Sequence, residues 1–237
     1  PMKAIVKSKP LPGIEILDLQ VPSPQPDEVL IQVERVGICG SDLHIYEWTP
    51  GYESLEKYFP VVLGHEFSGV VVEAGNEAKN HFRPGERVTS ETGKICGHCF
   101  YCQKGRGVLC ELRLRFGRIG LERNGAMARY LTVPWTSLHP IPPHVSFEEA
   151  AMTEPAAVAM GAVRTATIEP GDDIAIFGPG PIGLMILQIC KFRGAGRVMV
   201  FGLPEDEARL RMAEEFGADH VFLSGREDAL KAIGEMT

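Results

Sequence analysis

Four of the six cysteines lie in one short segment with the spacing C-x2-C-x2-C-x7-C, and these are Cys96, Cys99, Cys102 and Cys110. Thiolates three residues apart can meet at one metal ion, and the longer spacer lets the chain fold back with the fourth. Four thiolates form a closed tetrahedral shell, which is typical of structural zinc. An iron–sulfur cluster usually continues with x3-C-P, which is absent here, and reduced, unligated thiols are the remaining alternative. We therefore predict a structural zinc that offers no position to a substrate.

The length and charge narrow the class of protein. The 237 residues are about right for two domains, and the net charge of -7 comes from interspersed acids and bases. This balance argues against nucleic acid and acidic membrane surfaces as partners. The sequence shows neither a run of about 18 apolar residues nor a secretory signal. We expect a cytoplasmic chain with reduced thiols, where clustered cysteines are more often metal ligands or catalytic groups than disulfides.

Two kinds of hydrophobic pattern divide the chain near residue 150. Before it, short β-branched runs punctuated by Pro and Gly predict strands, at residues 3–8, 28–38, 67–75, 86–90 and 127–134. After it, residues 145–166 have helical spacing, with Ser146 and Glu149 placed as a capping box. Strands and helices then alternate, at residues 172–177, 181–194, 197–201, 205–218 and 219–223. Such alternation predicts a parallel sheet with crossover helices.

A glycine-rich turn follows the first of these later strands. The stretch "FGPGPIGL" contains G-x-G-x-x-G at Gly178, Gly180 and Gly183, between a buried strand and a helix. Gly178 suits a tight turn, Gly180 lets a pyrophosphate approach the backbone, and Gly183 lets the helix pack on the strand. The helix N-terminus, which includes Pro181 and Ile182, would hold the phosphates of a dinucleotide. A glycine-rich turn without a ligand is the alternative.

Further candidate ligands stand apart from the cysteine cluster. The stretch "GICGSDLHIY" offers Cys39, Ser41, Asp42 and His44, "VVLGHEFSG" offers His65 and Glu66, and "MTEPAA" offers Glu154. Each is weak alone, because a lone cysteine is most often a small buried residue. A lone histidine is more often satisfied or solvated than a ligand. Ser41 and Asp42 also suit turns and helix caps.

Taken together, the motifs resemble those of the zinc-dependent medium-chain dehydrogenases, especially the polyol (sorbitol-type) and threonine dehydrogenase branch. The matching stretches are "GICGSDLHIYEW", "GHEFSGVVVEAG", the cysteine cluster, "TEPAAVA" and "FGPGPIGL", in family order along the chain. The resemblance implies an α/β plus β protein. Residues 1–150 would form a strand-rich GroES-like catalytic domain, and residues 151–237 the first part of a Rossmann-type dinucleotide-binding domain.

The resemblance also implies a second, catalytic zinc. Cys39, His65 and Glu66 would bind it, with Glu154 as a further ligand, directly or through water. A thiolate, an imidazole and a carboxylate leave one position open, where zinc acts as a Lewis acid on an alcohol oxygen. The resemblance therefore implies two zinc ions per chain, one structural and one catalytic.

The implied reaction is hydride transfer from a secondary alcohol to NAD(P). Ser41 would take the alcohol proton, His44 would pass it outward, and Asp42 would hydrogen-bond His65 and fix its tautomer. A polyol or sugar alcohol is the expected substrate. An L-threonine 3-dehydrogenase-like activity, toward which "HIYEW" leans, is the alternative. The expected assembly is a homo-oligomer, a dimer or a tetramer.

The sequence departs from the family pattern where the cofactor's ribose would bind. NAD-preferring members usually have an acid at the end of the second strand of the nucleotide domain. Gly202 occupies that place here, and Glu205 and Asp206 follow. Glu205 is the candidate ribose ligand, although both acids also suit a helix N-terminus. Arg209, a turn or more into the helix, suits a solvated position as well as a 2′-phosphate, so we expect NAD rather than NADP.

The parallel-sheet part stops after three predicted strands, whereas a doubly wound domain needs two such halves. Its first strand would be left with an unpaired apolar edge. The chain is therefore a fragment, or part of the protein is not included, or a partner covers the edge. We expect residues 1–237 alone to bind zinc but to turn over alcohol poorly. A truncated, non-catalytic zinc-binding relative and a zinc-free quinone reductase type are the competing hypotheses.

Overall fold

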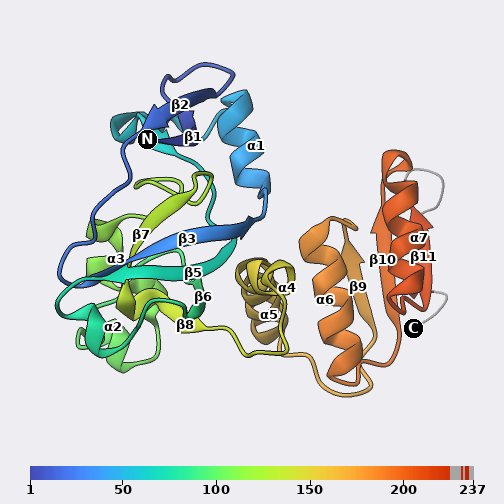
Figure 1. The fold of residues 1–237 in the computed structure, drawn as a ribbon. Coiled ribbons are helices and arrows are strands. Elements are labelled where there is room, and N and C mark those ends of the chain that lie inside the picture. The colour runs from blue at the N-terminus through green and yellow to red at the C-terminus, as the bar shows by residue number, and fades with distance from the viewer. Residues whose placement is uncertain (225–230, 232, 235–237) are drawn as a thin grey trace. The chain divides into compact units, whose positions relative to one another are not determined.

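The computed structural model describes residues 1–224, 231, 233 and 234, and the side chains of all of these except 114 and 115. The chain divides into two compact units, Pro1–Glu154 and Pro155–Thr237 (Figure 1). This division lies close to the boundary predicted near residue 150. Each unit has its own sheets and its own buried cluster of apolar side chains.

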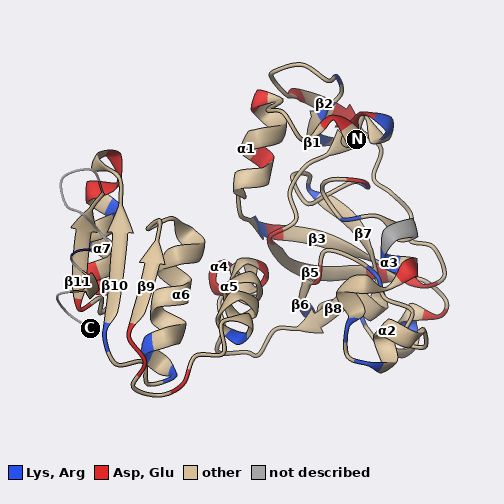
Figure 2. Ribbon diagram, turned by 180° about the vertical axis from the view of Figure 1, so that it is seen from behind, with Lys and Arg blue, Asp and Glu red and all other residues tan. Residues whose placement is uncertain are grey.

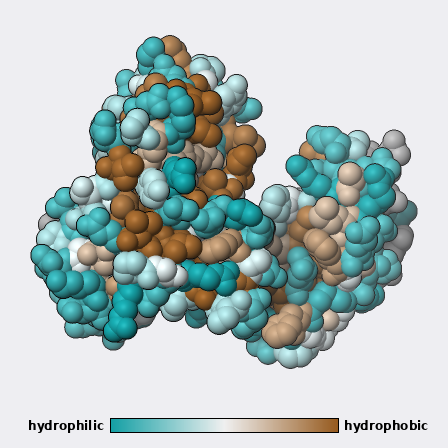
Figure 3. Space-filling view, in the orientation of Figure 1, coloured by the Kyte–Doolittle hydropathy of each residue, from teal (hydrophilic) through white to brown (hydrophobic). Residues whose placement is uncertain are grey.

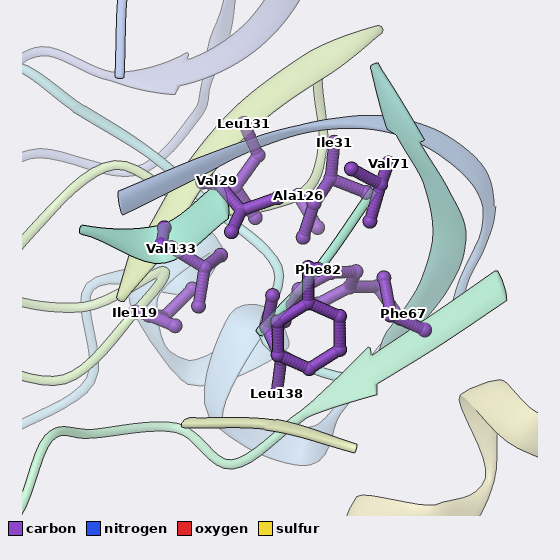
Figure 4. Close-up of a cluster of buried hydrophobic side chains, with 12 residues drawn as sticks. Val29, Ile31, Phe67, Val71, Phe82, Ile119, Ala126, Leu131, Val133 and Leu138 are labelled. Carbon is purple, nitrogen blue, oxygen red and sulfur yellow. The ribbon is translucent and has the colours of Figure 1, made fainter. Parts of the chain in front are cut away.

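The first unit is built around a five-stranded antiparallel sheet in the order β7-β3-β5-β6-β8. The strands are β3 (Glu28–Val36), β5 (Phe67–Ala74), β6 (Arg87–Ser90), β7 (Tyr130–Pro134) and β8 (Leu138–Pro140). Alternate apolar residues of these strands point to one side and form a buried cluster with Phe82 and Ile119 (Figure 4). The predicted strands in this sheet are confirmed, and β8 is an addition to them.

A smaller antiparallel sheet in the order β2-β1-β4 completes the strands of the first unit. These are β1 (Met2–Lys7), β2 (Glu15–Leu19) and β4 (Val61–Val62). The strand predicted at residues 3–8 is confirmed as β1. The sequence gives no signal for the other two, because β2 is exposed along nearly its whole length and β4 has two residues.

Short helices occupy the connections of this unit. They are α1 (Gly40–Glu47), α2 (Phe100–Gln103) and α3 (Glu111–Phe116), with 3-10 turns at Glu53–Tyr58, Ala78–Asn80, Gly107–Leu109 and Trp135–Ser137. Figure 3 shows where apolar side chains gather on the surface of the first unit. Exposed large hydrophobic residues on and just before α1 include Ile38 and Leu43.

Lys7, at the end of β1, is a fully buried lysine without a carboxylate partner among the described residues. Its ammonium group donates to the backbone carbonyls of Leu11, of Gly13 at 3.0 Å and of Tyr46 at 3.5 Å. It also lies 5.3 Å from the ring centroid of Trp48, and burial lowers the pKa of Lys7. This side chain therefore joins β1, the loop after it and the C-terminal end of α1.

The helix predicted over residues 145–166 is in fact two helices, α4 (Phe147–Ala151) and α5 (Thr153–Thr165). The predicted capping box begins α4. The Ser146 hydroxyl accepts from the backbone N–H of Glu149 at 3.1 Å, and the Glu149 carboxylate accepts from that of Ser146 at 2.7 Å. Pro155 explains the break, because proline lacks the N–H of a continuous helix and its ring would clash with the carbonyl of Ala151.

The second unit alternates strands and helices as the sequence predicts. In chain order these are β9 (Ile174–Phe177), α6 (Pro181–Phe192), β10 (Val198–Gly202), α7 (Glu207–Glu215) and β11 (His220–Leu223), with a 3-10 turn at Pro204–Asp206. The three strands are parallel, in the order β11-β10-β9. Within the described residues β9 is therefore an edge strand, as expected for an incomplete doubly wound sheet. The end of the predicted second domain, at residues 225–230, 232 and 235–237, lies outside the described residues.

The surface carries both signs of charge. Figure 2 shows acidic and basic residues spread over both units. Some form exposed pairs, such as Lys3 with Asp18 at 2.7 Å and Arg211 with Glu207 at 2.9 Å. In the part of the chain that the structure describes, no helix is long and apolar enough to cross a membrane.

Candidate metal centres and cofactor turn

The four clustered cysteines converge in a segment between β6 and β7, which we call the cysteine lobe (residues 94–116). Cys99 caps α2, Cys102 lies within it, and Cys110 caps α3. Their four sulfur atoms all lie within 4.8 Å of one another. None of them is in a disulfide. Four free sulfurs at this separation fit a tetrahedral zinc ion.

Backbone amides of the cysteine lobe point at its sulfur atoms. The N–H groups of Cys99 and Cys96 donate to the sulfurs of Cys96 and Cys110, both at 3.3 Å. Burial acts to raise the pKa of the Cys110 thiol, but hydrogen bonds from the backbone of Cys96 and Arg113 lower it to about 6. Burial and the neighbouring thiols raise the pKa of Cys102 to about 12. A zinc ion bound here would displace the thiol protons.

A second group of potential ligands assembles from two separate segments. Cys39 is the N-cap of α1, whereas His65 and Glu66 directly precede β5. One ligand atom from each lies within 4.8 Å of the other two, and His65 and Glu66 are buried. Such a set of three leaves a fourth tetrahedral position open. We call these three residues the mixed site.

The charges of the mixed site act strongly on one another. Interaction with His65 holds the pKa of the Cys39 thiol below its ordinary value. Burial lowers the pKa of His65, but Cys39, Asp42 and Glu154 together raise it above the ordinary value. Nδ1 of His65 is buried and has no hydrogen-bond partner in the described structure. A buried imidazole nitrogen without a partner, beside a thiol and a carboxylate, fits a zinc ligand.

Asp42 contacts the backbone of both ligand segments. Its carboxylate accepts from the N–H of Cys39 at 2.9 Å, which closes a capping box on α1, and from the N–H of Gly64 at 3.3 Å. The expected hydrogen bond to His65 is not among those of the described residues. Asp42 therefore acts on the mixed site through its charge and through the backbone of Cys39 and of the residue before His65.

Glu154, at the start of α5, lies beside the mixed site rather than in the group of three. Its negative charge raises the pKa of both His65 and Glu66. Burial raises the pKa of Glu154 itself, and the charges of His65 and Arg113 oppose that rise. The sequence motifs do not single out Arg113. The signal that could have pointed to Arg113 is its position in α3, the helix that follows Cys110.

Ser41 and His44 both lie on α1, with different surroundings. Oγ of Ser41 is buried and has no hydrogen-bond partner in the described structure. The His44 side chain is exposed, and its Nδ1 lies 3.2 Å from the hydroxyl oxygen of Thr49. Its ring stacks on Tyr52, with the ring centroids 5.6 Å apart. Sequence reasoning did not predict Thr49 and Tyr52 as neighbours of His44.

The glycine-rich turn connects β9 to α6. Gly178 has a φ of 99°, and Gly180 is the N-cap of α6, with Pro181 in its first turn. A Cβ on Gly183 would lie 2.0 Å from the carbonyl oxygen of Gly178, so a larger residue would push the helix from the strand. A Cβ on Gly180 would meet no described atom within 4 Å. The space before the helix N-terminus can therefore admit a phosphate.

Packing is tight at the end of β10, where the acid is absent. A Cβ on Gly202 would lie 3.1 to 3.2 Å from three neighbouring side chains, so a larger residue would require these neighbours to shift. Asp206 accepts from the N–H of Leu203 at 3.2 Å and from the Arg209 guanidinium at 2.9 Å. Glu205 is exposed and has no hydrogen bond among the described residues.

Two family models match the sequence. The alcohol dehydrogenase GroES-like domain matches residues 25–143, and the zinc-binding dehydrogenase model matches residues 181–237. The first range contains the cysteine lobe and the mixed site. The second begins within the glycine-rich turn and covers the rest of the parallel sheet.

Curated relatives match over nearly the whole chain. The D-arabitol-phosphate dehydrogenase of Enterococcus avium is 43% identical over 97% of this chain. The sorbitol dehydrogenase of Halalkalibacterium halodurans is 40% identical over 100%, and an L-threonine 3-dehydrogenase of Rhizobium etli is 37% identical over 98%. The chain spans 64% of the first relative's length and 66% of each of the others.

Solved structures of nicotinamide-bound enzymes are also similar. A protein from Sinorhizobium meliloti described as a zinc-binding dehydrogenase, bound to NADP, has a TM-score of 0.84 at 34% identity, covering 98% of this chain and 64% of that one. A protein from Escherichia coli described as a short chain alcohol dehydrogenase, complexed with NADH, has a TM-score of 0.88 at 31% identity, covering 99% and 66%. With both family models and these relatives in agreement, the chain belongs to the zinc-dependent medium-chain dehydrogenase family.

Proposed function

We propose that the whole protein is a zinc-dependent oxidoreductase that transfers hydride from a secondary alcohol, a polyol or sugar alcohol, to NAD(P). The observation that carries this proposal is the mixed site, where Cys39, His65 and Glu66 bring ligand atoms within 4.8 Å of one another. The relatives named sorbitol and arabitol-phosphate dehydrogenases support a polyol substrate. Because the chain spans about two thirds of their lengths, the proposal concerns the whole protein.

Zinc held by Cys39, His65 and Glu66 would act as a Lewis acid that lowers the pKa of an alcohol oxygen in the open position. Glu154 is a further ligand in this proposal, directly or through water, because its charge already acts on His65. Asp42 keeps the Cys39 segment and the His65 segment together through its two backbone hydrogen bonds. Because the Asp42 carboxylate binds the backbone of both segments, it would hold the zinc ligands in place before a substrate arrives.

The chain's own residues would carry the alcohol proton. Oγ of Ser41 is buried without a partner in the described structure, so it would accept the proton of an alcohol at the open position and release its own hydroxyl proton toward His44. The exposed imidazole of His44 would pass this proton to solvent. Thr49, with its hydroxyl at 3.2 Å from Nδ1, would hold the ring while it does so.

The glycine-rich turn would bind the cofactor through Gly178, Gly180 and Gly183, with the pyrophosphate at the N-terminus of α6. We propose NAD over NADP. Arg209 pairs with Asp206, whose negative charge would repel a 2′-phosphate, whereas the unpartnered carboxylate of Glu205 could accept from ribose hydroxyls. NADP and NADH each occupy one of the two similar structures, so both cofactors occur among similar proteins.

The remaining expectations complete the proposal. The unit Pro1–Glu154 would be the GroES-like catalytic domain with both zinc ions, and Pro155–Thr237 the first part of the Rossmann-type domain. The cytoplasm is the proposed location, since its reducing conditions keep zinc-binding thiols free. A dimer or tetramer is the proposed assembly, which sedimentation equilibrium would test.

L-threonine is the second candidate substrate, because L-threonine 3-dehydrogenases are 37% identical to this chain. Measuring kcat/KM of the whole protein for sorbitol and for L-threonine distinguishes the two candidate substrates. A value at least tenfold higher for L-threonine would move the assignment to that branch, since tenfold corresponds to about 1.4 kcal/mol of transition-state binding.

Zinc content tests the proposed metal sites directly. We expect two zinc ions per purified chain by elemental analysis, and one after Cys39→Ala. Cys190→Ala is the matched control, because Cys190 is a buried core residue of α6 and should leave both ions in place. A single zinc that Cys39→Ala does not change would reject the catalytic site and favour a structural zinc module.

Residues 1–237 alone should bind zinc but oxidise polyols poorly, because the described parallel sheet contains one half of the expected nucleotide domain. NADH production by this chain, compared with that of the whole protein, measures the difference. Equal kcat values would show that the missing half is dispensable.

A further inference from the structure

Arg113 lies where the cysteine lobe approaches the mixed site. Strand β6 pairs antiparallel with β5, with Ser68 opposite Thr89, so the chain after β6 runs back toward the start of β5. His65 and Glu66 directly precede that start. Nη2 of Arg113 donates to the hydroxyl oxygen of Thr92, two residues beyond β6, at 3.1 Å. The register thus places Thr92, which accepts from the guanidinium group, near the start of β5.

A second connection supports this placement. The N–H of Ile119 donates to the carbonyl of Thr92 at 2.8 Å, and the N–H of Ala126 donates to the carbonyl of Gly64 at 2.9 Å. One segment after α3 therefore contacts both the partner of Arg113 and the residue before His65.

The surroundings of Arg113 leave its charge unpaired. Neighbouring cations have carboxylate partners: Lys94 pairs with Asp27, Arg118 with Glu122 at 2.8 Å, and Arg123 with Glu28 at 2.8 Å. Arg113 is half-buried, and the described residues offer it no ion pair. A guanidinium has five N–H donors, so most of them remain available after the bond to Thr92.

The backbone beside Arg113 is shaped around its side chain. A Cβ on Gly93 would lie 3.2 Å from Cγ of Arg113 and 3.5 Å from both Nε and Cζ. Glycine at this position lets the flat guanidinium lie close to the chain. Because Arg113 forms no ion pair among the described residues, its remaining N–H donors are available to an anionic ligand group.

We propose that Arg113 binds the phosphate group of a phosphorylated polyol while the mixed site holds the alcohol that is oxidised. This inference rests on the proposed function and narrows its substrate class to polyol phosphates. A guanidinium suits phosphate because its planar donors can form two parallel hydrogen bonds to one phosphate group. The 43% identical relative named D-arabitol-phosphate dehydrogenase agrees with this class. The carboxylate of L-threonine is the other anion that Arg113 could bind, and the experiment separates the two.

The test is calorimetric titration of the zinc-loaded protein with sorbitol 6-phosphate, sorbitol and L-threonine, with NADH present so that no polyol is oxidised. We expect sorbitol 6-phosphate to bind about tenfold tighter than sorbitol or better, as charge-assisted hydrogen bonds allow. Arg113→Gln should bring the two affinities to within about twofold, and Arg113→Lys should keep part of the difference because it keeps the charge without the fork. Arg106→Gln is the matched control, an exposed arginine of the same lobe, and should keep the full difference.

Each other outcome decides against the inference in a recognisable way. An unchanged phosphate preference in Arg113→Gln would overturn it, as would loss of a zinc ion from that variant, which would make Arg113 a structural residue. Arg113-dependent binding of L-threonine without a phosphate preference would assign the site to a carboxylate. Zinc-dependent binding of sorbitol without a phosphate preference would overturn this inference and leave the proposed function standing. Absence of zinc-dependent binding for all three probes would overturn both.

Discussion

The cysteine lobe and the mixed site lie in the same unit but are assembled in different ways. All four sulfurs of the lobe come from one continuous segment, and backbone N–H groups of that segment point at them. The mixed site instead joins Cys39 at the start of α1 to His65 and Glu66 before β5, and Asp42 holds the two segments together. The lobe is thus specified locally, whereas the mixed site exists only once the sheet has formed.

The two groups also differ in what they leave unsatisfied. The mixed site keeps a histidine nitrogen and a serine hydroxyl buried without partners in the described structure. The cysteine lobe, which is assembled locally, is therefore a closed site whose groups stabilise the fold. The mixed site, which is assembled from distant segments, is an open site that keeps polar groups without partners in the described structure. Four changes would break or sharpen this comparison.

The largest effect is expected from Cys110→Ser in the cysteine lobe. The variant should lose one zinc and unfold the lobe locally, because a structural zinc of this type contributes on the order of 10 kcal/mol to the segment that binds it. Elemental analysis and hydrogen exchange of residues 94–116 would measure this, with the mixed site still holding its ion. Retention of both ions and of slow exchange in the lobe would contradict the local assembly.

Asp42→Asn should weaken the mixed site and spare the lobe. The amide can accept one of the two backbone hydrogen bonds but turns an N–H toward the other donor, so the zinc affinity should fall about 10- to 100-fold. Competition with a zinc chelator would measure it. Asp18→Asn, which removes an exposed carboxylate paired with Lys3, is the control and should change nothing. A zinc affinity equal to that of the unmodified protein would mean that zinc binding does not need both hydrogen bonds of Asp42.

Acidification should release zinc from the mixed site before it releases zinc from the lobe. The pKa of His65 is raised, so its proton competes with zinc at a higher pH than an ordinary histidine's proton would, beginning above about 6.5. The group of ligands in the lobe consists of four cysteine sulfurs and contains no histidine. A coloured zinc indicator followed from pH 8 to pH 5 should report two steps, the first of which is absent in Cys39→Ala. Release of zinc in a single step, the same in the unmodified protein and in Cys39→Ala, would contradict this prediction.

The smallest effect is expected from Ser41→Ala. The hydroxyl has no partner in the described structure, so its removal should leave stability and both zinc ions nearly unchanged, within about 0.5 kcal/mol. Thermal unfolding and zinc analysis would check this, while polyol oxidation by the whole protein should fall sharply. A marked loss of stability would instead make Ser41 a structural residue like its neighbour Asp42.

Much of the fold could be predicted, because hydrophobic period and turn residues are local signals. The cysteine spacing by itself indicated one metal site, and the strand–turn–helix context of Gly178 to Gly183 indicated the cofactor turn. The helix break at Met152 was missed because the apolar spacing continues across it, although Pro155 carried the signal. Strand β2 was missed because its exposure removes the alternation that marks a half-buried strand.

The mixed site could not be derived from spacing, since its residues come together only through the pairing of β3, which precedes Cys39, with β5, which follows Glu66. The resemblance to a family indicated that Cys39, His65 and Glu66 form one site. Resemblance did not reveal that Asp42 binds two backbone N–H groups, that a side chain at Gly202 would crowd its neighbours, or that Arg113 forms no ion pair among the described residues. Each of these depends on distances between segments that are far apart in the sequence.

The buried ammonium group of Lys7 makes this residue a chemical reporter of how often the first unit opens. Acylating reagents need a solvent-accessible, neutral amine, and here the amine is enclosed and bound to three carbonyl oxygens. Exposed lysines such as Lys3 should be labelled at once, whereas labelling of Lys7 should follow the rate of local unfolding at β1 and the end of α1. Mass spectrometry of the two peptides, recorded over time, would measure how often the first unit opens around this one buried side chain.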